Sequence, residues 1–123
     1  MSAKSPTPIR RPNVESPLCP IFHDAVELIG RRWNGAILYV LMRGPHRYHE
    51  LLTAIPNLSD RVLTVRLREL EANELISRTV EPGPPVKVSY QLTPAGQDLN
   101  AVIDAIGAWG HKWREQASPS EGK

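Results

Sequence analysis

Two arginines and a threonine are spaced in residues 59–72 so that a helix would present them together to DNA. At about 100° per residue, Arg61 and Arg68 fall on one side and Thr64 at its flank. Guanidinium groups donate in pairs to guanine edges and also bind phosphates. The other side of the same helix is an apolar seam: Leu63, Leu67 and Leu70. This pattern is typical of a DNA-reading helix, and an ordinary solvated charged face is the alternative.

The flanking residues define where this helix begins and what else it presents. Ser59 is placed to cap the first turn with its hydroxyl, and Asp60 suits the positive end of the helix dipole. Val65 lies on the outward side between the two arginines, where a small residue lets the backbone approach the groove. Arg66 lies to the side, where it could contact phosphate or pair with an acidic residue.

The composition supports a single domain with tails and offers no catalytic signature. The chain has 123 residues, a net charge of +2 and 41% hydrophobic residues. Residues 31–68 hold seven arginines and two acidic residues, an excess that can face phosphates. Four histidines and one cysteine show no metal-ligand spacing, and no phosphate loop or nucleophile motif is present. We therefore expect no enzyme, metal or cofactor, no membrane segment, and a cytoplasmic location.

Hydrophobic periodicity predicts four helices ahead of a β-hairpin. Residues 1–18 are proline-rich and basic and are expected to be a disordered arm. The helices are predicted near residues 20–30, 33–43, 48–55 and 60–72, the third and fourth at helix-turn-helix spacing. Residues 75–80 and 86–92 read as two antiparallel strands joined by a turn at 81–85.

A last helix is predicted to begin at Thr93-Pro94 and to carry an apolar stripe. Gly107 and Gly110 lie within it and indicate close packing or a bend. Residues 115–123 are expected to be a disordered tail, so the domain spans 19–114. The fold class is α+β, mainly helical: a winged helix-turn-helix. Arg78 and Lys87 in the hairpin, and Tyr48 and His49 at the third helix, are candidate phosphate contacts, although Tyr48 could instead be core.

The motifs, taken in order, resemble the HxlR-type transcriptional regulators of bacteria and archaea, relatives of the MarR winged-helix group. They extend from about Cys19 to Trp113. The motifs are Cys19-Pro20, Leu28-Ile29-Gly30-Arg31-Arg32-Trp33, Ile37-Leu38, Arg43-Gly44-Pro45-His46-Arg47-Tyr48-His49-Glu50-Leu51, Ser59 with Leu63 and Leu67-Arg68-Glu69-Leu70, Leu75-Ile76-Ser77-Arg78, Pro84-Pro85-Val86-Lys87-Val88-Ser89-Tyr90-Gln91-Leu92-Thr93-Pro94-Ala95-Gly96 and Trp109-Gly110. Two departures are Asn34, where many members have threonine or serine, and Asn73-Glu74, which replaces an acidic-Gly turn.

The resemblance implies a homodimer on a pseudo-palindromic operator in double-stranded DNA. It implies dimerisation through the first and last helices, with the fourth helix in the major groove and the wing near the backbone or minor groove. Trp33 is expected to pack in the core or dimer and not to form a ligand cage. A winged helix used only for protein contact is the alternative function. The predicted interface residues are Phe22, Leu99, Val102, Ile103, Ile106, Trp109 and Trp113.

Cys19 is the candidate sensor residue. Some HxlR-type members sense electrophiles or oxidants through a cysteine just before the first helix, and the effector here is unknown. A helix N-terminus favours the reactive thiolate, whereas many free cysteines are simply buried packing residues. With one cysteine per chain, a disulfide would need a partner chain or a small thiol.

Overall fold

The computed structural model describes residues 17–117, with side chains as far as Arg114. Most of the predicted arm (1–18) and of the predicted tail (115–123) therefore lies outside the described residues. The chain divides into two compact units, Met1–Arg31 and Arg32–Lys123, and each is described by itself.

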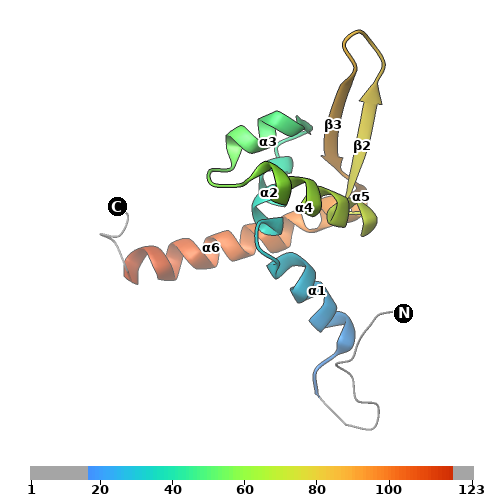
Figure 1. Cartoon of the computed structure of the whole chain (residues 1–123). Helices are drawn as coiled ribbons and strands as arrows, with labels where there is room; N and C mark the ends of the chain where they lie inside the picture. Colours follow the sequence, from blue (N-terminus) through green and yellow to red (C-terminus); the bar gives the residue numbers. More distant parts are fainter. Residues whose placement is uncertain (1–16, 118–123) are drawn as a thin grey trace. The chain divides into compact units, whose positions relative to one another are not determined.

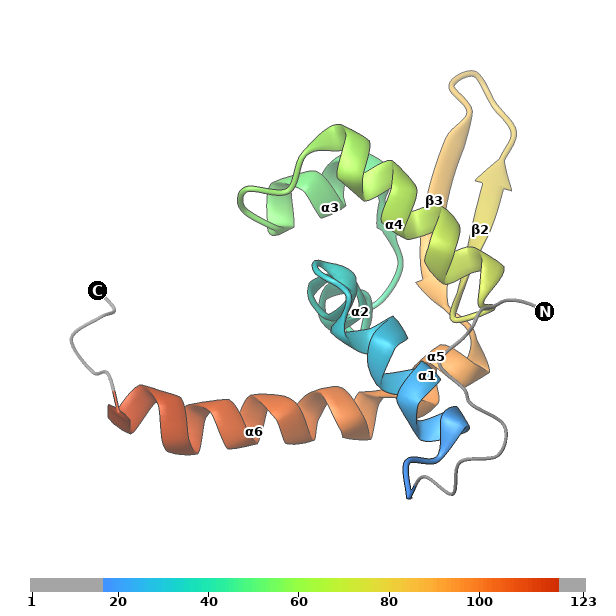
Figure 2. The same ribbon diagram turned by 60° about the horizontal axis from the view of Figure 1, so that its bottom comes forward.

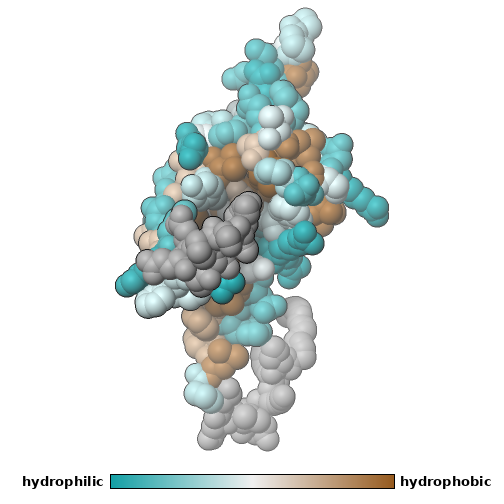
Figure 3. Space-filling view, turned by 90° about the vertical axis from the view of Figure 1, so that its left-hand side faces the viewer, coloured by the Kyte–Doolittle hydropathy of each residue, from teal (hydrophilic) through white to brown (hydrophobic). Residues whose placement is uncertain are grey.

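The first unit contains one helix, α1 (Pro20–Gly30), which follows Cys19 directly. Pro20 occupies the first turn, where its missing N–H costs no hydrogen bond. No side chain of α1 is buried, and Figure 3 shows hydrophobic side chains gathered along it. Ile21, Phe22 and Val26 are 79%, 61% and 47% exposed. The described chain therefore leaves the apolar side chains of α1 exposed to solvent.

The second unit has the winged helix-turn-helix order that the sequence predicts. Its elements are α2 (Asn34–Leu41), β1 (His46–Arg47), α3 (Tyr48–Ala54), α4 (Asp60–Ala72), β2 (Ile76–Glu81), β3 (Lys87–Leu92), α5 (Pro94–Asp98) and α6 (Asn100–Ala117). Figures 1 and 2 show β2 and β3 extending past the helices as a long hairpin, the wing. The predicted fold class is confirmed.

The sheet has a third strand that the sequence analysis missed. The strand order is β1-β3-β2, with both pairs antiparallel, and His46 lies opposite Tyr90. Two residues are too short to show an alternating pattern, so β1 exists only through its pairing with β3. The strand ties the start of α3 to the base of the wing.

The core lies where α2, α3, α4, the base of the wing and the start of α6 meet. Burying each such aliphatic side chain contributes about 1.5–3 kcal/mol relative to its exposure. The buried side chains include Ile37, Leu38, Leu41, Leu51, Leu63, Leu67, Leu70, Ile76, Leu92 and Ile103. The predicted apolar seam of residues 63, 67 and 70 is thus the core face of α4, which leaves its opposite face to solvent.

The prediction of one long last helix is wrong, because the helix is divided at Leu99. Thr93 caps α5 by accepting from the Gly96 N–H at 3.1 Å. The Leu99 N–H bonds to the Gly96 carbonyl, a tighter i→i−3 turn, and α6 begins at the next residue. Gly96 is buried, and a Cβ there would collide with the Leu75 carbonyl oxygen. Close backbone packing therefore holds α5 against Leu75, the residue before β2, and α6 begins beyond it.

The glycines of α6 are not closely packed within the described part of the single chain. The helix continues from Asn100 to Ala117, past the predicted domain end at residue 114. No atom of the described chain would lie within 4 Å of a Cβ at Gly107 or Gly110. Close packing of these glycines within the single chain is therefore not observed.

The connection from α4 to β2 depends on a left-handed residue. Glu74 has φ 60°, a conformation that costs a side-chain-bearing residue energy and favours glycine. The Leu75 N–H then bonds back to the Leu70 carbonyl at 3.0 Å and closes the helix end. This is the position at which the sequence departs from the acidic-Gly turn.

Candidate nucleic-acid interface

The outward face of α4 includes Arg61, Val65 and Arg68, all exposed. The helix begins as predicted, with the Ser59 hydroxyl accepting from the Val62 N–H at 3.1 Å. Neither arginine forms an ion pair with any residue in the part of the chain that the structure describes. Two unpaired guanidinium groups with a half-exposed valine between them therefore project from one side of the helix.

Tyr48 and Asp60 hold α3 against the first turns of α4. The Tyr48 hydroxyl lies 2.6 Å from the Asp60 carboxylate, 2.8 Å from the Asp60 carbonyl oxygen and 2.9 Å from the Thr64 hydroxyl. Burial, followed by the hydrogen bond to the Asp60 carboxylate, raises the pKa of Tyr48. Thr64 also donates to the Asp60 carbonyl. These three residues, predicted as DNA contacts, are bonded to one another and set the angle of the helix-turn-helix.

Arg66 is partly exposed, and its guanidinium is bonded within the domain. Its Nε donates to the Arg32 carbonyl at 2.8 Å, and its guanidinium lies 3.7 Å from the Glu69 carboxylate. The buried Asn34 side chain donates to the same carboxylate at 3.3 Å. Of the two roles that the sequence left open, Arg66 pairs with an acid, and it fixes α4 to the segment before α2.

The start of α3 carries one exposed cation that the sequence analysis did not select. Arg47 lies in β1, two residues before the predicted contact His49, and both side chains are exposed. The Arg47 N–H donates to the Glu50 carboxylate at 2.8 Å, and this hydrogen bond lowers the pKa of Glu50. The position of Arg47 immediately before the first helix of the helix-turn-helix could have identified it from the sequence. Arg47 joins His49 as a candidate phosphate contact.

Arg78 and Lys87 lie on opposite faces of the wing. Arg78 lies opposite Tyr90, on the face that includes the buried Ile76 and Leu92. Lys87 lies opposite Glu81, three residues further along β2 and hence on the other face. That second face is polar: the Gln91 amide donates to the hydroxyls of Ser77 and Thr79 at 3.0 and 2.7 Å. The wing therefore presents one cation on each side.

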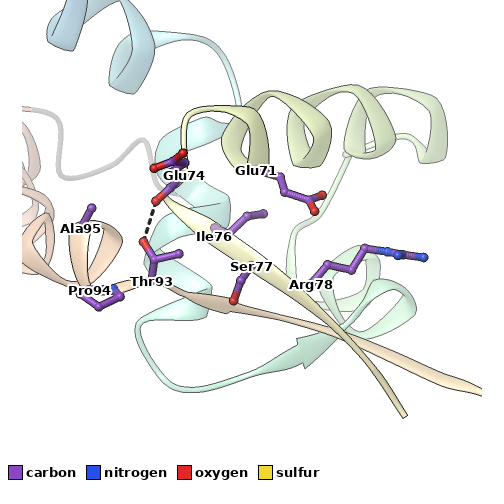
Figure 4. Close-up of a pocket in the computed structure, with 8 residues that line it drawn as sticks. All are labelled: Glu71, Glu74, Ile76, Ser77, Arg78, Thr93, Pro94 and Ala95. Carbon is purple, nitrogen blue, oxygen red and sulfur yellow. Dashed lines mark hydrogen bonds between the residues drawn. The ribbon is translucent and has the colours of Figure 1, made fainter. Parts of the chain in front are cut away.

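A shallow pocket of about 500 Å³ lies at the base of the wing (Figure 4). The Thr93 hydroxyl donates to the Glu74 carbonyl at 2.7 Å at one end of it. The Arg78 side chain, which also lines the pocket, extends away from that end. The lining residues are Glu71, Glu74, Ile76, Ser77, Arg78, Thr93, Pro94 and Ala95. Its contacts stabilise the junction of α4, β2 and α5.

The predicted dimer residues of α6 are mostly exposed in the single chain. Val102, Ile106, Trp109 and Trp113 are between 42% and 59% exposed, and Leu99 is partly exposed. Apolar side chains of α6 line a groove of about 540 Å³. The lining residues are Ala101, Val102, Ala105, Ile106 and Trp109. Ile103 is the exception, since it is 7% exposed and belongs to the core of the single chain.

Cys19 is an exposed free cysteine at the N-cap of α1. Its side chain makes no capping hydrogen bond. In the described segment 17–117, no three side chains of His, Cys, Asp or Glu gather in a way that could hold a metal ion. Over the same segment, none of the helices has the length and apolar character that crossing a membrane requires.

Known proteins with similar sequences are helix-turn-helix regulators. Residues 28–118 match the model of the HxlR-like helix-turn-helix family. The HTH-type transcriptional regulator YodB of Bacillus subtilis is 46% identical over 98 residues, which are 80% of this chain and 88% of YodB. A second regulator of that organism, YvaP, is 39% identical over 99 residues, 80% of this chain and 92% of YvaP. These relatives are transcriptional regulators, so the prediction of a regulator and not an enzyme is confirmed.

Solved structures of YodB share the fold. Its reduced form has a TM-score of 0.72 at 46% identity and covers 78% of this chain and 94% of that chain. Its diamide-treated form has a TM-score of 0.69 at 45% identity, with 80% and 97% covered. Its quinone-bound form has a TM-score of 0.68 at 42% identity, with 78% and 100% covered.

Proposed function

Because the chain belongs to the HxlR-like helix-turn-helix family of transcriptional regulators, we propose that it binds a specific operator in double-stranded DNA through α4. The observation that carries this proposal is the outward face of α4, where Arg61 and Arg68 are exposed and unpaired among the described residues. Arg61 is the nearer to the helix N-terminus, the end that contacts base edges in helix-turn-helix proteins. The two cations of the wing then contact the backbone beside the groove.

Selection of bound fragments from random DNA duplexes, followed by fluorescence anisotropy on the selected site, tests this function. We expect a selected sequence whose affinity exceeds that of unrelated DNA by about 10³-fold or more. Arg61→Ala should weaken operator binding by about 1–3 kcal/mol and relax the preference at one base pair per half-site. A folded protein that selects no sequence would instead support the alternative, a winged helix used for protein contact.

We propose further that the protein is a homodimer assembled through α1 and α6. Exposed apolar side chains on both helices support this, among them Phe22 on α1 and Ile106, Trp109 and Trp113 on α6. A C2 dimer would present its two α4 helices about 34 Å apart, one turn of DNA, on a pseudo-palindromic site. Light scattering at micromolar concentration should give twice the chain mass. A monomer both free and on DNA would overturn the assembly.

Cys19 is proposed as the residue through which oxidants or electrophiles change DNA affinity. Its exposure supports this role, and YodB has been solved in reduced, diamide-treated and quinone-bound forms. With diamide, two thiols lose two electrons and two protons to the azo bond and join as a disulfide, the second thiol coming from the partner chain or a small thiol. With a quinone, the thiolate adds to the ring carbon, and protonation completes a hydroquinone thioether.

A titration of operator affinity separates the two readings of Cys19. We expect diamide or a quinone to change the affinity of the wild type and to leave Cys19→Ser unaffected. A tenfold change in affinity corresponds to about 1.4 kcal/mol between the DNA-competent and modified states. Identical binding by both proteins before and after treatment would show that Cys19 does not control DNA affinity.

A further inference from the structure

Val65 is the one apolar side chain at the centre of the outward face of α4, and it is 50% exposed. The side chains on either side of it in the sequence form hydrogen bonds within the domain. Thr64 is bonded to Tyr48 and to the Asp60 carbonyl, and Arg66 to the Arg32 carbonyl. The side chains left to meet a ligand are therefore Val65 and the arginines that flank it in space.

A single exposed valine is unremarkable on most surfaces, but the position of Val65 is specific. It lies four residues after Arg61 and three before Arg68, so the three side chains form one stripe. Valine is a poorer helix former than alanine, lysine or glutamine, so helix stability alone does not favour it here. Its branched side chain holds essentially one rotamer in a helix, which presents its methyl groups at a fixed place with little entropy to lose.

The major groove offers one apolar group to such a side chain, the C5-methyl group of thymine. The two guanidinium groups supply the charge complementarity that seats this face against DNA. Along the helix axis Val65 is about 6 Å from Arg61. That separation corresponds to one or two base pairs at about 3.4 Å each.

We propose that Val65 is a specificity-determining residue that reads a thymine methyl group, one or two base pairs from the pair read by Arg61. This inference rests on the proposed function of α4. It adds the identity of a base to that function, because cytosine presents a polar amino group and no methyl group at that edge.

Replacing thymine by deoxyuridine tests the contact with the change of one methyl group. Each thymine of the selected operator is replaced in turn, and the affinity is measured by fluorescence anisotropy. We expect one position per half-site at which deoxyuridine lowers wild-type affinity about three- to fivefold, the scale of one buried methyl group. At that position, a change to C·G should weaken binding, and 5-methylcytosine should recover part of the loss.

The variant Val65→Ala should lose this sensitivity and bind the thymine and deoxyuridine operators equally. Alanine favours the helix, so the variant should fold, as circular dichroism can verify. Val80→Ala is the matched control: Val80 is 47% exposed and lies in the wing, so the same truncation there should leave the deoxyuridine effect intact.

Two results would overturn the inference while leaving the proposed function intact. One is a wild-type protein that selects an operator but binds every deoxyuridine form as tightly as the thymine form. The other is a Val65→Ala protein that keeps the full deoxyuridine effect. A protein that selects no sequence at all would instead overturn the DNA-binding function itself, and the Val65 contact with it.

Discussion

The phenolic oxygen of Tyr48 lies 2.6 Å from a carboxylate oxygen of Asp60, a hydrogen bond from the first residue of α3 to the first residue of α4. The same hydroxyl lies 2.9 Å from that of Thr64, one turn further along α4. The two helices of the helix-turn-helix are thus joined at their N-terminal ends by side chains as well as by the core. The angle at which α4 would meet DNA depends on this contact.

Tyr48→Phe should lower the free energy of unfolding by about 1 kcal/mol, because the Asp60 and Thr64 groups lose a partner. The pKa of Tyr48 is raised above its ordinary value of 10.0, so its stabilisation is present below pH 10 and is lost as the pH rises through the folded-state pKa. Urea unfolding should show the difference from wild type shrinking above pH 10. Tyr39→Phe, at an exposed tyrosine, is the control for the loss of a phenolic hydroxyl.

Alanine substitutions at Arg66 and Arg68 should have different effects, the first on stability and the second on DNA binding. Arg66→Ala removes the bonds to the Arg32 carbonyl and the Glu69 carboxylate, so it should lower stability by about 1 kcal/mol and leave the salt dependence of DNA binding unchanged. Arg68→Ala should change stability by less than about 0.5 kcal/mol and reduce the salt slope by about 1. Equal salt slopes for the two variants would contradict this assignment.

Glu74→Gly should raise the free energy of unfolding by about 0.5–1 kcal/mol, because glycine adopts the left-handed conformation at φ 60° without a Cβ penalty. The hydrogen bond from Thr93 ends on the backbone carbonyl of residue 74, so the substitution retains it. Glu74→Ala provides the comparison, since alanine keeps the Cβ and should bring no such gain. Urea unfolding of the three proteins measures the difference.

Arg78 and Lys87 should contribute separately to DNA binding, since a wing with a cation on each face suits insertion beside or into the minor groove. Each alanine substitution should weaken binding to all sequences and reduce the salt slope by about 1, and the double variant by about 2. Anisotropy titrations over a range of salt concentrations measure these slopes. A double variant no weaker than one of the single variants would show that only one face of the wing meets DNA.

Much of the fold was predictable because its determinants are local in sequence. The seam of Leu63, Leu67 and Leu70 repeats at helical spacing, and Ser59 marks the start of α4 with a cap three residues from its partner. The long strands of the wing carry their own alternation and turn residues. The outward face of α4 followed from the same spacing, since burying one side of a helix exposes the other.

The tertiary structure decided the roles that depend on residues distant in sequence. β1 is two residues long and exists through pairing across 44 positions, from His46 to Tyr90. Arg66 has a structural role because the Arg32 carbonyl, 34 positions away, lies within reach of its guanidinium. Periodicity specifies which way a side chain points from its own helix, but a hydrogen bond between elements depends on how those elements pack. For that reason the sequence predicted α4 as the candidate DNA-reading helix, and the packing distinguished the side chains left exposed on it from those that hold the helix in place.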